Sequence, residues 1–145
     1  TIVELGVRSG WSTRAFSAAA KIVGAKMVGV DLSDNCKDVY HELVGEENGF
    51  AVTGDSAEMA QDYPLWVADR HELGLHSTVD MLFIDTSHLY SETVRELNAW
   101  GPLMSERAAI VLHDTNLPPS LEYTRKDGSK GEGWDNEHGV SRAVA

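Results

Sequence analysis

The sequence has little cysteine and little positive charge. Cys36 is the single cysteine among 145 residues, so no disulfide can form within the chain, as is usual in a reducing cytoplasm. Lys and Arg number 12 against 23 Asp and Glu, which gives a formal net charge of −11. This balance argues against a broad phosphate-binding surface, so nucleic acid is not an expected partner.

Long hydrophobic runs, repeats and a targeting signal are also missing. No apolar run approaches the ~18 residues of a membrane helix, and no basic-then-apolar signal peptide opens the chain. We therefore expect a cytoplasmic location without membrane contact. The chain starts inside a predicted strand without an initiator Met, and residues 141–145 resemble the first turn of a helix. We expect one domain over residues 1–145, as a fragment truncated at both ends.

Strand and helix patterns alternate along the chain, which predicts an α/β fold. The predicted strands cover residues 2–5, 26–30, 50–53, 79–85 and 108–112. The predicted helices cover residues 12–23, 36–47, 57–73 and 89–100, the third of them broken or kinked by Pro64. Leu65, Trp66, Val67 and Leu73 are predicted to be core. The strand at 79–85 is almost continuously apolar, as expected for a central parallel strand that is covered on both faces.

These elements predict a Rossmann-like doubly wound parallel sheet in the strand order 3-2-1-4-5. The strand near Ile110 would then be an open edge. We expect a partner, a second copy of the chain included, or further chain to cover it. Residues 117–139 show no periodic pattern and predict a lid or flexible loop. In this stretch Trp134 and the basic residues Arg125, Lys126 and Lys130 either meet a substrate or belong to a solvated loop.

The first turn of the chain carries two glycines spaced four residues apart, Gly6 and Gly10, between a strand and a helix. Gly6 supplies a conformation that a Cβ would hinder, and Gly10 would let the helix start lie close to a ligand. Ser12 or Thr13 can cap the helix. The alternative is an ordinary turn from strand to helix.

Acidic residues follow the next two strands. Asp31 lies 21 residues beyond Gly10, close to the offset at which dinucleotide folds place the acid that binds the ribose hydroxyls. Its alternative role, shared with Ser33, is to cap the next helix. Asp55 and Ser56 stand at the end of the third strand, where contact with adenine and helix capping are equal alternatives.

Polar residues also follow the carboxyl ends of the fourth and fifth predicted strands. Asp85 and His88 follow the central strand, and His113 and Asp114 follow the edge strand. Ligands of open α/β sheets bind at the carboxyl ends of the strands. Because consecutive strands are usually neighbours, we expect Asp85 and Asp114 to lie close together.

Together these motifs resemble the class I S-adenosylmethionine-dependent methyltransferases, over nearly the whole chain. The closest resemblance is to the branch of cephalosporin-hydroxylase-type and sugar or macrolide O-methyltransferases. The motifs that carry it are Glu4-x-Gly6-x-x-x-Gly10-x-Ser12-Thr13, Val30-Asp31, Gly54-Asp55-Ser56, Phe83-Ile84-Asp85-x-x-His88-x-Tyr90 and Val111-Leu112-His113-Asp114. The resemblance implies two further strands after residue 145, which this chain lacks.

The resemblance also implies which residues contact S-adenosylmethionine. Glu4, Gly6 and Gly10 would border its methionine part, Asp31 would hold the ribose, and Asp55 and Ser56 would flank the adenine. The complete set of implied cofactor residues is Glu4, Gly6, Arg8, Gly10, Ser12, Asp31, Asp55, Ser56 and Asp85. Arg8 stands where the commonest methyltransferase motif has a further glycine.

Several members of this branch bind a divalent metal through acids after the fourth and fifth strands, and Asp85 and Asp114 match those positions. Such oxygen ligands suit Mg²⁺. His113 replaces an acid of related enzymes, which favours Mn²⁺ or another transition ion. Asn116 offers a further oxygen. His88 is either the general base, acting beside Asp85, or a structural histidine at the start of a helix.

The resemblance therefore implies methyl transfer from S-adenosylmethionine to a hydroxyl of a small molecule. One alternative is an NAD(P)-dependent oxidoreductase. The chain lacks the G-x-G-x-x-G spacing that cradles a pyrophosphate, and its strand-end acids would repel phosphates. The other alternative is a methyltransferase-like domain that binds the cofactor without catalysis.

Overall fold

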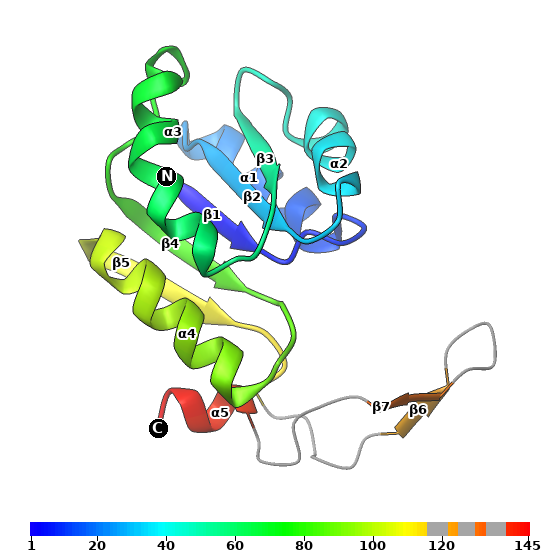
Figure 1. The fold of residues 1–145 in the computed structure, drawn as a ribbon. Coiled ribbons are helices and arrows are strands. Elements are labelled where there is room, and N and C mark those ends of the chain that lie inside the picture. Colours follow the sequence, from blue (N-terminus) through cyan, green and yellow to red (C-terminus); the bar gives the residue numbers. More distant parts are fainter. Residues whose placement is uncertain (116–121, 125–129, 133–138) are drawn as a thin grey trace.

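The fold is a five-stranded parallel sheet with helices on both faces (Figure 1). The computed structural model describes residues 1–115, 122–124, 130–132 and 139–145. The strands of the sheet are β1 (Ile2–Leu5), β2 (Met27–Asp31), β3 (Gly49–Thr53), β4 (Val79–Ile84) and β5 (Met104–Leu112). The α-helices are α1 (Trp11–Val23), α2 (Asn35–Leu43), α3 (Tyr63–Asp69), α4 (Tyr90–Trp100) and α5 (Gly139–Ala143). The 3₁₀ helices are η1 (Glu58–Asp62), η2 (His71–Leu73) and η3 (Gly101–Leu103).

The strand order is β3-β2-β1-β4-β5, which confirms the predicted Rossmann-like topology. β1 lies in the middle, where Val3 is paired with Val28 of β2 on one side and with Leu82 of β4 on the other. From β1 the chain adds β2 and β3 on one side of the sheet and then β4 and β5 on the other, so the strand order reverses between β1 and β4. In this class of fold, ligands bind outside the carboxyl ends of the strands at that reversal.

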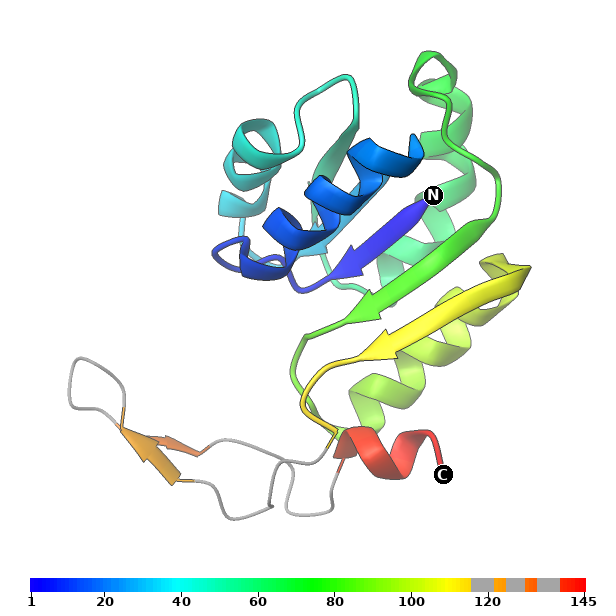
Figure 2. The same cartoon turned by 180° about the vertical axis from the view of Figure 1, so that it is seen from behind.

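Each face of the sheet has its own hydrophobic core. Helices α1 and α2 cover the face seen in Figure 2, where Ala20, Met27 and Tyr40 are buried together. Helices α3 and α4 cover the other face, where Tyr63 and Trp100 pack against Leu82. Burial on both faces explains why the strand at β4 is nearly continuously apolar.

Several element boundaries differ from the prediction. Helix α2 ends at Leu43 rather than near residue 47, because Gly45 adopts a left-handed conformation with φ of 84°. Pro64 does break the segment 57–73, and it stands in the first turn of α3, where its missing N–H leaves no helical hydrogen bond unmade. Leu65 is 61% exposed, so its prediction as a core residue was wrong. Trp66, Val67 and Leu73 do pack against the core.

The edge strand β5 and the segment after it also contain more regular structure than the sequence predicted. β5 begins at Met104, earlier than predicted, and within the described residues it pairs only with β4. Residues 122–124 and 130–132 form an antiparallel pair, β6 (Glu122–Thr124) and β7 (Lys130–Glu132), where the sequence predicted no regular structure. Asn116, Arg125, Lys126 and Trp134 lie outside the described residues. No helix in the described part of the chain is long and apolar enough to cross a membrane.

Candidate functional site: a cavity and a donor cluster at the strand ends

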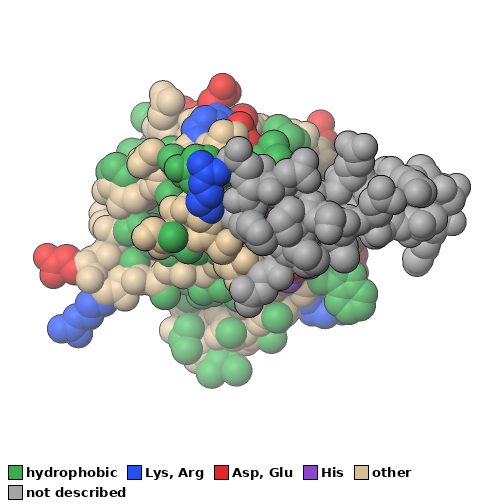
Figure 3. Space-filling view, turned by 90° about the horizontal axis from the view of Figure 1, so that it is seen from below, with side chains coloured by type: hydrophobic (Ala, Val, Ile, Leu, Met, Phe, Trp, Pro, Cys, Tyr) green, Lys and Arg blue, Asp and Glu red, His purple; other side chains and the backbone are tan. Residues whose placement is uncertain are grey.

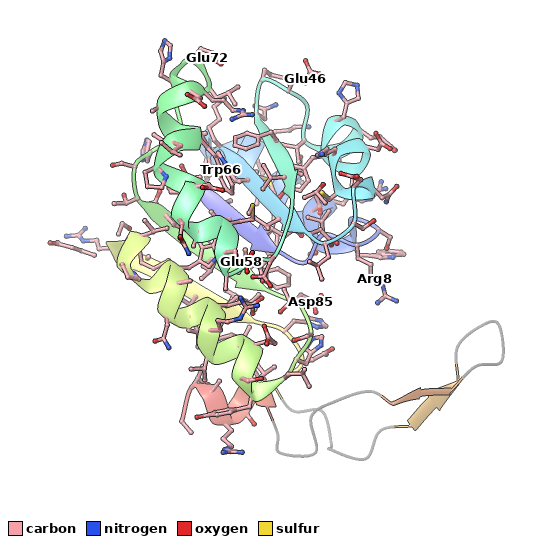
Figure 4. All side chains as sticks on the ribbon, in the orientation of Figure 1. Arg8, Glu46, Glu58, Trp66, Glu72 and Asp85 are labelled. Carbon is pink, nitrogen blue, oxygen red and sulfur yellow. The ribbon has the colours of Figure 1, made fainter. Side chains whose placement is uncertain are left out.

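A cavity of about 460 Å³ opens at the carboxyl ends of the strands, a volume typical of sites for cofactors and small molecules. Figure 4 shows Arg8 and Asp85 at this end of the sheet. Among the predicted cofactor residues, those that line the cavity are Gly6, Arg8, Asp31, Asp55, Ser56 and Asp85. Glu4, Gly10 and Ser12 are not among its lining residues. The strand-end acids are therefore brought together, whereas part of the glycine turn is not.

Gly6 lies at the closest approach between the turn after β1 and the end of β4. Its φ of 89° is left-handed, and a Cβ at this position would meet the carbonyl oxygen of Asp85 at 2.1 Å. Both facts demand glycine. A Cβ at Gly10, whose φ is 78°, would lie 2.6 and 2.7 Å from side-chain atoms of Val39 and Leu43, so this glycine lets the start of α1 pack closely against α2. That Gly10 also lies close to a ligand stays a prediction.

Glu4 is completely buried beneath the turn and is held by three hydroxyl groups. Ser12 Oγ donates to its Oε1 at 2.6 Å, and Thr13 Oγ1 and Tyr40 OH donate to its Oε2 at 2.8 and 2.9 Å. Burial raises the pKa of Glu4, and these hydrogen bonds oppose the rise. Ser12 and Thr13 therefore do not cap α1, because the buried carboxylate needs their protons. The prediction of a capping role was wrong.

Asp31 fastens the turn from the other side. Its Oδ2 accepts the backbone N–H groups of Val7 and Arg8, each at 2.8 Å, and its Oδ1 accepts the N–H of Ser33 at 2.8 Å. Helix α2 has Asp34 at its N-cap, so Asp31 does not cap it. A carboxylate offers about four acceptor directions, so three hydrogen bonds leave room for a ligand hydroxyl.

Asp55 is bound on both of its oxygens. Its Oδ1 accepts the N–H groups of Ala57 and Glu58 at 3.0 Å, which is the capping role that the sequence offered as an alternative. Arg95 of α4 forms a bidentate pair with it, with Nη1–Oδ1 at 2.8 Å and Nη2–Oδ2 at 2.5 Å. The Arg95 guanidinium lowers the pKa of Asp55 from 3.8 to about 2. No sequence pattern predicts this pair, because its partners are 40 residues apart.

The Asp55–Arg95 pair predicts a pH-dependent contribution to stability. Because the folded-state pKa of Asp55 is depressed, the stabilisation is present above about pH 4 and disappears as pH falls through about 2. The pair is partly solvated, so we expect Arg95→Gln to lower the urea midpoint by roughly a few tenths molar at about pH 6. Below about pH 2 the difference should vanish. Lys21→Gln, on exposed α1, should follow the wild type; a pH-independent deficit in Arg95→Gln would refute the pair's role.

Glu96 is a lining residue that the sequence analysis missed. The buried residues of α4 are Thr93, Glu96 and Trp100. Glu96 is 1% exposed and accepts hydrogen bonds from Ser56 and Thr86. A buried acid on a helix has no signature in hydrophobic periodicity.

Four side chains of the kinds that can bind a metal ion converge beside the cavity. Asp85, His88, His113 and Asp114 place one ligand atom each within 4.8 Å of one another. His88 Nε2 lies 3.0 Å from Asp85 Oδ1 and 3.5 Å from Asp114 Oδ2. His113 Nδ1 lies 3.3 Å from Asp85 Oδ1 and 3.1 Å from Asp114 Oδ1. The predicted proximity of Asp85 and Asp114 is therefore found in the structure.

The backbone around this cluster is strained. Arg8, His88 and Asp114 have φ of 50°, 61° and 56°, in the left-handed region that non-glycine residues seldom adopt. Such conformations gather where surrounding structure enforces a functional geometry. Burial raises the pKa of Asp85, but its hydrogen bond with His88 and the nearby positive groups prevail, and the net pKa is below its usual value. Asp85 is thus held as a carboxylate.

A doubly wound sheet, a cavity at its switch point and an acid after β2 are together the features of a Rossmann-like domain. A family model described as a methyltransferase domain matches residues 3–115. This match covers well over half of the chain, which therefore belongs to the methyltransferase-domain family. A search of curated proteins gives no match.

Solved structures share this fold at low sequence identity. The S-adenosylhomocysteine-bound methyltransferase PaMTH1 of Podospora anserina is similar with a TM-score of 0.57 and 18% identity, over 79% of this chain and 45% of its own. An S-adenosylmethionine-dependent methyltransferase of Mesorhizobium loti is similar with a TM-score of 0.54 and 16% identity, over 93% of this chain and 57% of its own. A short-chain dehydrogenase/reductase of Brucella melitensis is similar with a TM-score of 0.53 and 18% identity, over 77% of this chain and 52% of its own. The chain spans about half the length of these proteins, and the fold alone does not choose between their cofactors.

Proposed function

We propose that this domain binds S-adenosylmethionine in the cavity and transfers its methyl group to a hydroxyl of a small molecule, with a divalent cation at the donor cluster. The observation that carries the proposal is the double position of Asp85, which lines the cavity and also belongs to the cluster of ligand side chains. A cofactor and a cation at these two sites would meet at one carboxylate. That adjacency is what a cation-assisted transfer requires.

The placement of the cofactor follows from the lining residues. Asp31 has an acceptor direction left for a ribose hydroxyl, and Gly6 leaves the turn open beside it. The adenine would lie toward Ser56, and the methionine part toward Asp85. Carboxylates line the cavity at Asp31, Asp55, Asp85, Glu92 and Glu96, against the two cations of Arg8 and Arg95. This charge favours a ligand with a sulfonium and an ammonium over a pyrophosphate, and so disfavours the NAD(P) alternative.

The donor cluster fits a divalent cation. For an ion with six ligands at about 2.1 Å, neighbouring ligand atoms lie ~3.0 Å apart. Among the three ligands proposed here, His113 Nδ1 lies 3.3 Å from Asp85 Oδ1 and 3.1 Å from Asp114 Oδ1. Asp85, Asp114 and His113 would hold the ion, which when bound would lower the pKa of a substrate hydroxyl.

His88 would act as the general base of the reaction. Its side chain is 10% exposed and its Nε2 faces Asp85 and Asp114. The ring is therefore held next to the place where the substrate hydroxyl would bind. The imidazole would take the hydroxyl proton. S-adenosylmethionine, when bound, would supply the methyl group to that oxygen and leave as S-adenosylhomocysteine. Asp85 would orient the imidazole.

Calorimetric titration with S-adenosylhomocysteine, with and without Mn²⁺ or Mg²⁺, tests the proposal. Binding with roughly micromolar affinity supports the cofactor role and justifies a screen of hydroxylated acceptors. Absence of binding under every condition would remove the methyltransferase function. Binding without any turnover or cation effect would instead support a domain that binds the cofactor and does not catalyse.

The presence of His113 predicts a preference among cations. Imidazole is a better ligand for transition ions than for Mg²⁺, so wild type should bind Mn²⁺ more tightly than Mg²⁺. We expect His113→Asp to reduce the ratio of the two affinities about tenfold, as measured by calorimetry and by the electron paramagnetic resonance of free Mn²⁺. His41→Gln, a change of an exposed histidine on α2, should leave the ratio unaltered. An unchanged ratio in His113→Asp would exclude His113 as a ligand.

The proposal includes the setting of the reaction. Cys36 is a free, buried thiol, as proteins of a reducing cytoplasm commonly have. On the face seen in Figure 3, Lys and Arg side chains are scattered rather than gathered in one patch. We therefore propose a small-molecule acceptor rather than nucleic acid or a membrane.

A second copy of the chain is a candidate cover for β5, whose Ile110 and Val111 are 42% and 40% exposed.

A further inference from the structure

Glu96 is a buried acid whose role the proposed chemistry does not use. It lies on the inner face of α4, is 1% exposed and lines the cofactor cavity. Burial raises the pKa of Glu96, and hydrogen bonds from Ser56 and Thr86 oppose the rise. Arg95, the next residue toward the N-terminus, is paired with Asp55 and Glu92 instead. A buried acid held by two hydroxyls beside a ligand site needs a functional explanation.

The carboxylate of Glu96 joins two segments that the sheet keeps apart. Ser56 Oγ donates to its Oε1, and Thr86 Oγ1 donates to its Oε2 at 3.0 Å. Ser56 follows β3 and Thr86 follows β4, and two strands stand between them in the sheet. At a strand spacing of ~4.8 Å, β3 and β4 are about 14 Å apart. Glu96 therefore fixes the two hydroxyls relative to each other at the wall of the cavity.

These contacts decide what the two hydroxyls can offer a ligand. A hydroxyl has one proton and two lone pairs. Since the proton of Ser56 is donated to Glu96, its oxygen can present only lone pairs to the cavity. Ser56 can therefore accept a hydrogen bond from a ligand and cannot donate one.

The neighbouring acid is a poorer acceptor for the same task. Asp55 Oδ1 accepts two backbone N–H groups and Nη1 of Arg95, and its Oδ2 accepts Nη2 of Arg95, so the guanidinium neutralises the charge of this carboxylate. An amino group that approaches the end of β3 finds its acceptor in Ser56 rather than in Asp55.

We propose that Glu96 is a positioning residue, which orients the Ser56 hydroxyl so that Ser56 Oγ accepts the 6-amino group of adenine. The inference rests on the cofactor placement proposed above. It makes the site selective for a 6-aminopurine over a 6-oxopurine, because the oxygen of a 6-oxopurine would set its lone pairs against those of Ser56. Without Glu96, the Ser56 proton could turn toward the cavity and satisfy either base.

The test compares the affinities of S-adenosylhomocysteine and S-inosylhomocysteine by calorimetry. In wild type, we expect the inosine compound to bind about thirtyfold more weakly. Ser56→Ala and Glu96→Met should each reduce this ratio to less than about threefold. The double variant should reduce it no further, because the two residues act as one unit. A purely structural role of Glu96 would weaken both ligands equally and keep the ratio, which would overturn the inference.

Two further measurements keep the test decisive. Asp55→Asn should leave the ratio within about twofold of wild type, since Asp55 is occupied. If Asp55→Asn abolishes discrimination while Ser56→Ala retains it, the base is recognised by Asp55 and the inference fails. A wild-type ratio near one also refutes it, even if Glu96→Met does not fold. Failure of wild type to bind S-adenosylhomocysteine at all would instead refute the proposed cofactor site.

Discussion

Replacement of Asp85 by asparagine should lower kcat/KM for methyl transfer by at least about a thousandfold, while S-adenosylhomocysteine still binds within roughly tenfold of the wild-type affinity. The Asp85 carboxylate lies 3.0 Å from His88 Nε2 and 3.3 Å from His113 Nδ1, so it faces both imidazoles at once. Asparagine keeps the volume but loses the charge that orients His88 and binds a cation. Cation affinity should fall together with turnover.

Asp80→Asn is the matched control for this prediction. Asp80 lies on the same strand, β4, but toward its opposite end, and its side chain is 51% exposed. It should keep wild-type turnover and cation binding. If Asp85→Asn keeps both as well, the donor cluster takes no part in the reaction, and the reaction centre must lie elsewhere in the cavity.

Gly6→Ala should destabilise the domain by at least ~3 kcal/mol and abolish cofactor binding. A left-handed conformation costs a residue with a Cβ about 1–2 kcal/mol, and the added Cβ would also stand 2.1 Å from the carbonyl oxygen of Asp85. That neighbour is backbone and cannot rotate away. The turn after β1 must therefore separate from the end of β4, which widens the cavity at its centre. Urea unfolding and calorimetry measure the two effects.

Gly74→Ala separates the two contributions. Gly74 has φ of 69°, but a Cβ there would meet nothing within 4 Å. It should therefore show only the conformational cost, about 1 kcal/mol, with cofactor binding intact. Equal destabilisation by Gly6→Ala and Gly74→Ala would contradict the close packing of the turn against Asp85.

The fold was predictable because its strands and turns follow local rules. Short β-branched runs alternate with helical segments, and this alternation alone predicts a doubly wound parallel sheet. The rule that polar residues after parallel strands share one edge placed Asp31, Asp55, Asp85 and Asp114 correctly at that edge. Helix boundaries were less predictable, since Gly45 ends α2 before the stronger turn signal at residues 48 and 49.

The contacts of the site depended on tertiary structure and could not be read locally. Ser12 and Thr13 look like caps in the sequence, but the burial of Glu4 redirects their hydroxyls. Nothing near Glu4 in the sequence indicates that Tyr40 of α2 contributes the third proton. Likewise, Glu96 occupies a position where a pattern of apolar residues predicts nothing, because its partners follow two different strands.

The three backbone hydrogen bonds of Asp31 have a consequence for kinetics. The two from Val7 and Arg8 close the turn between β1 and α1 before a cofactor arrives, so the encounter does not wait for a loop to fold. Association should then show a single phase whose rate is linear in ligand concentration. The amide protons of Val7 and Arg8 should exchange slowly with solvent in the free domain and only slightly more slowly in the complex.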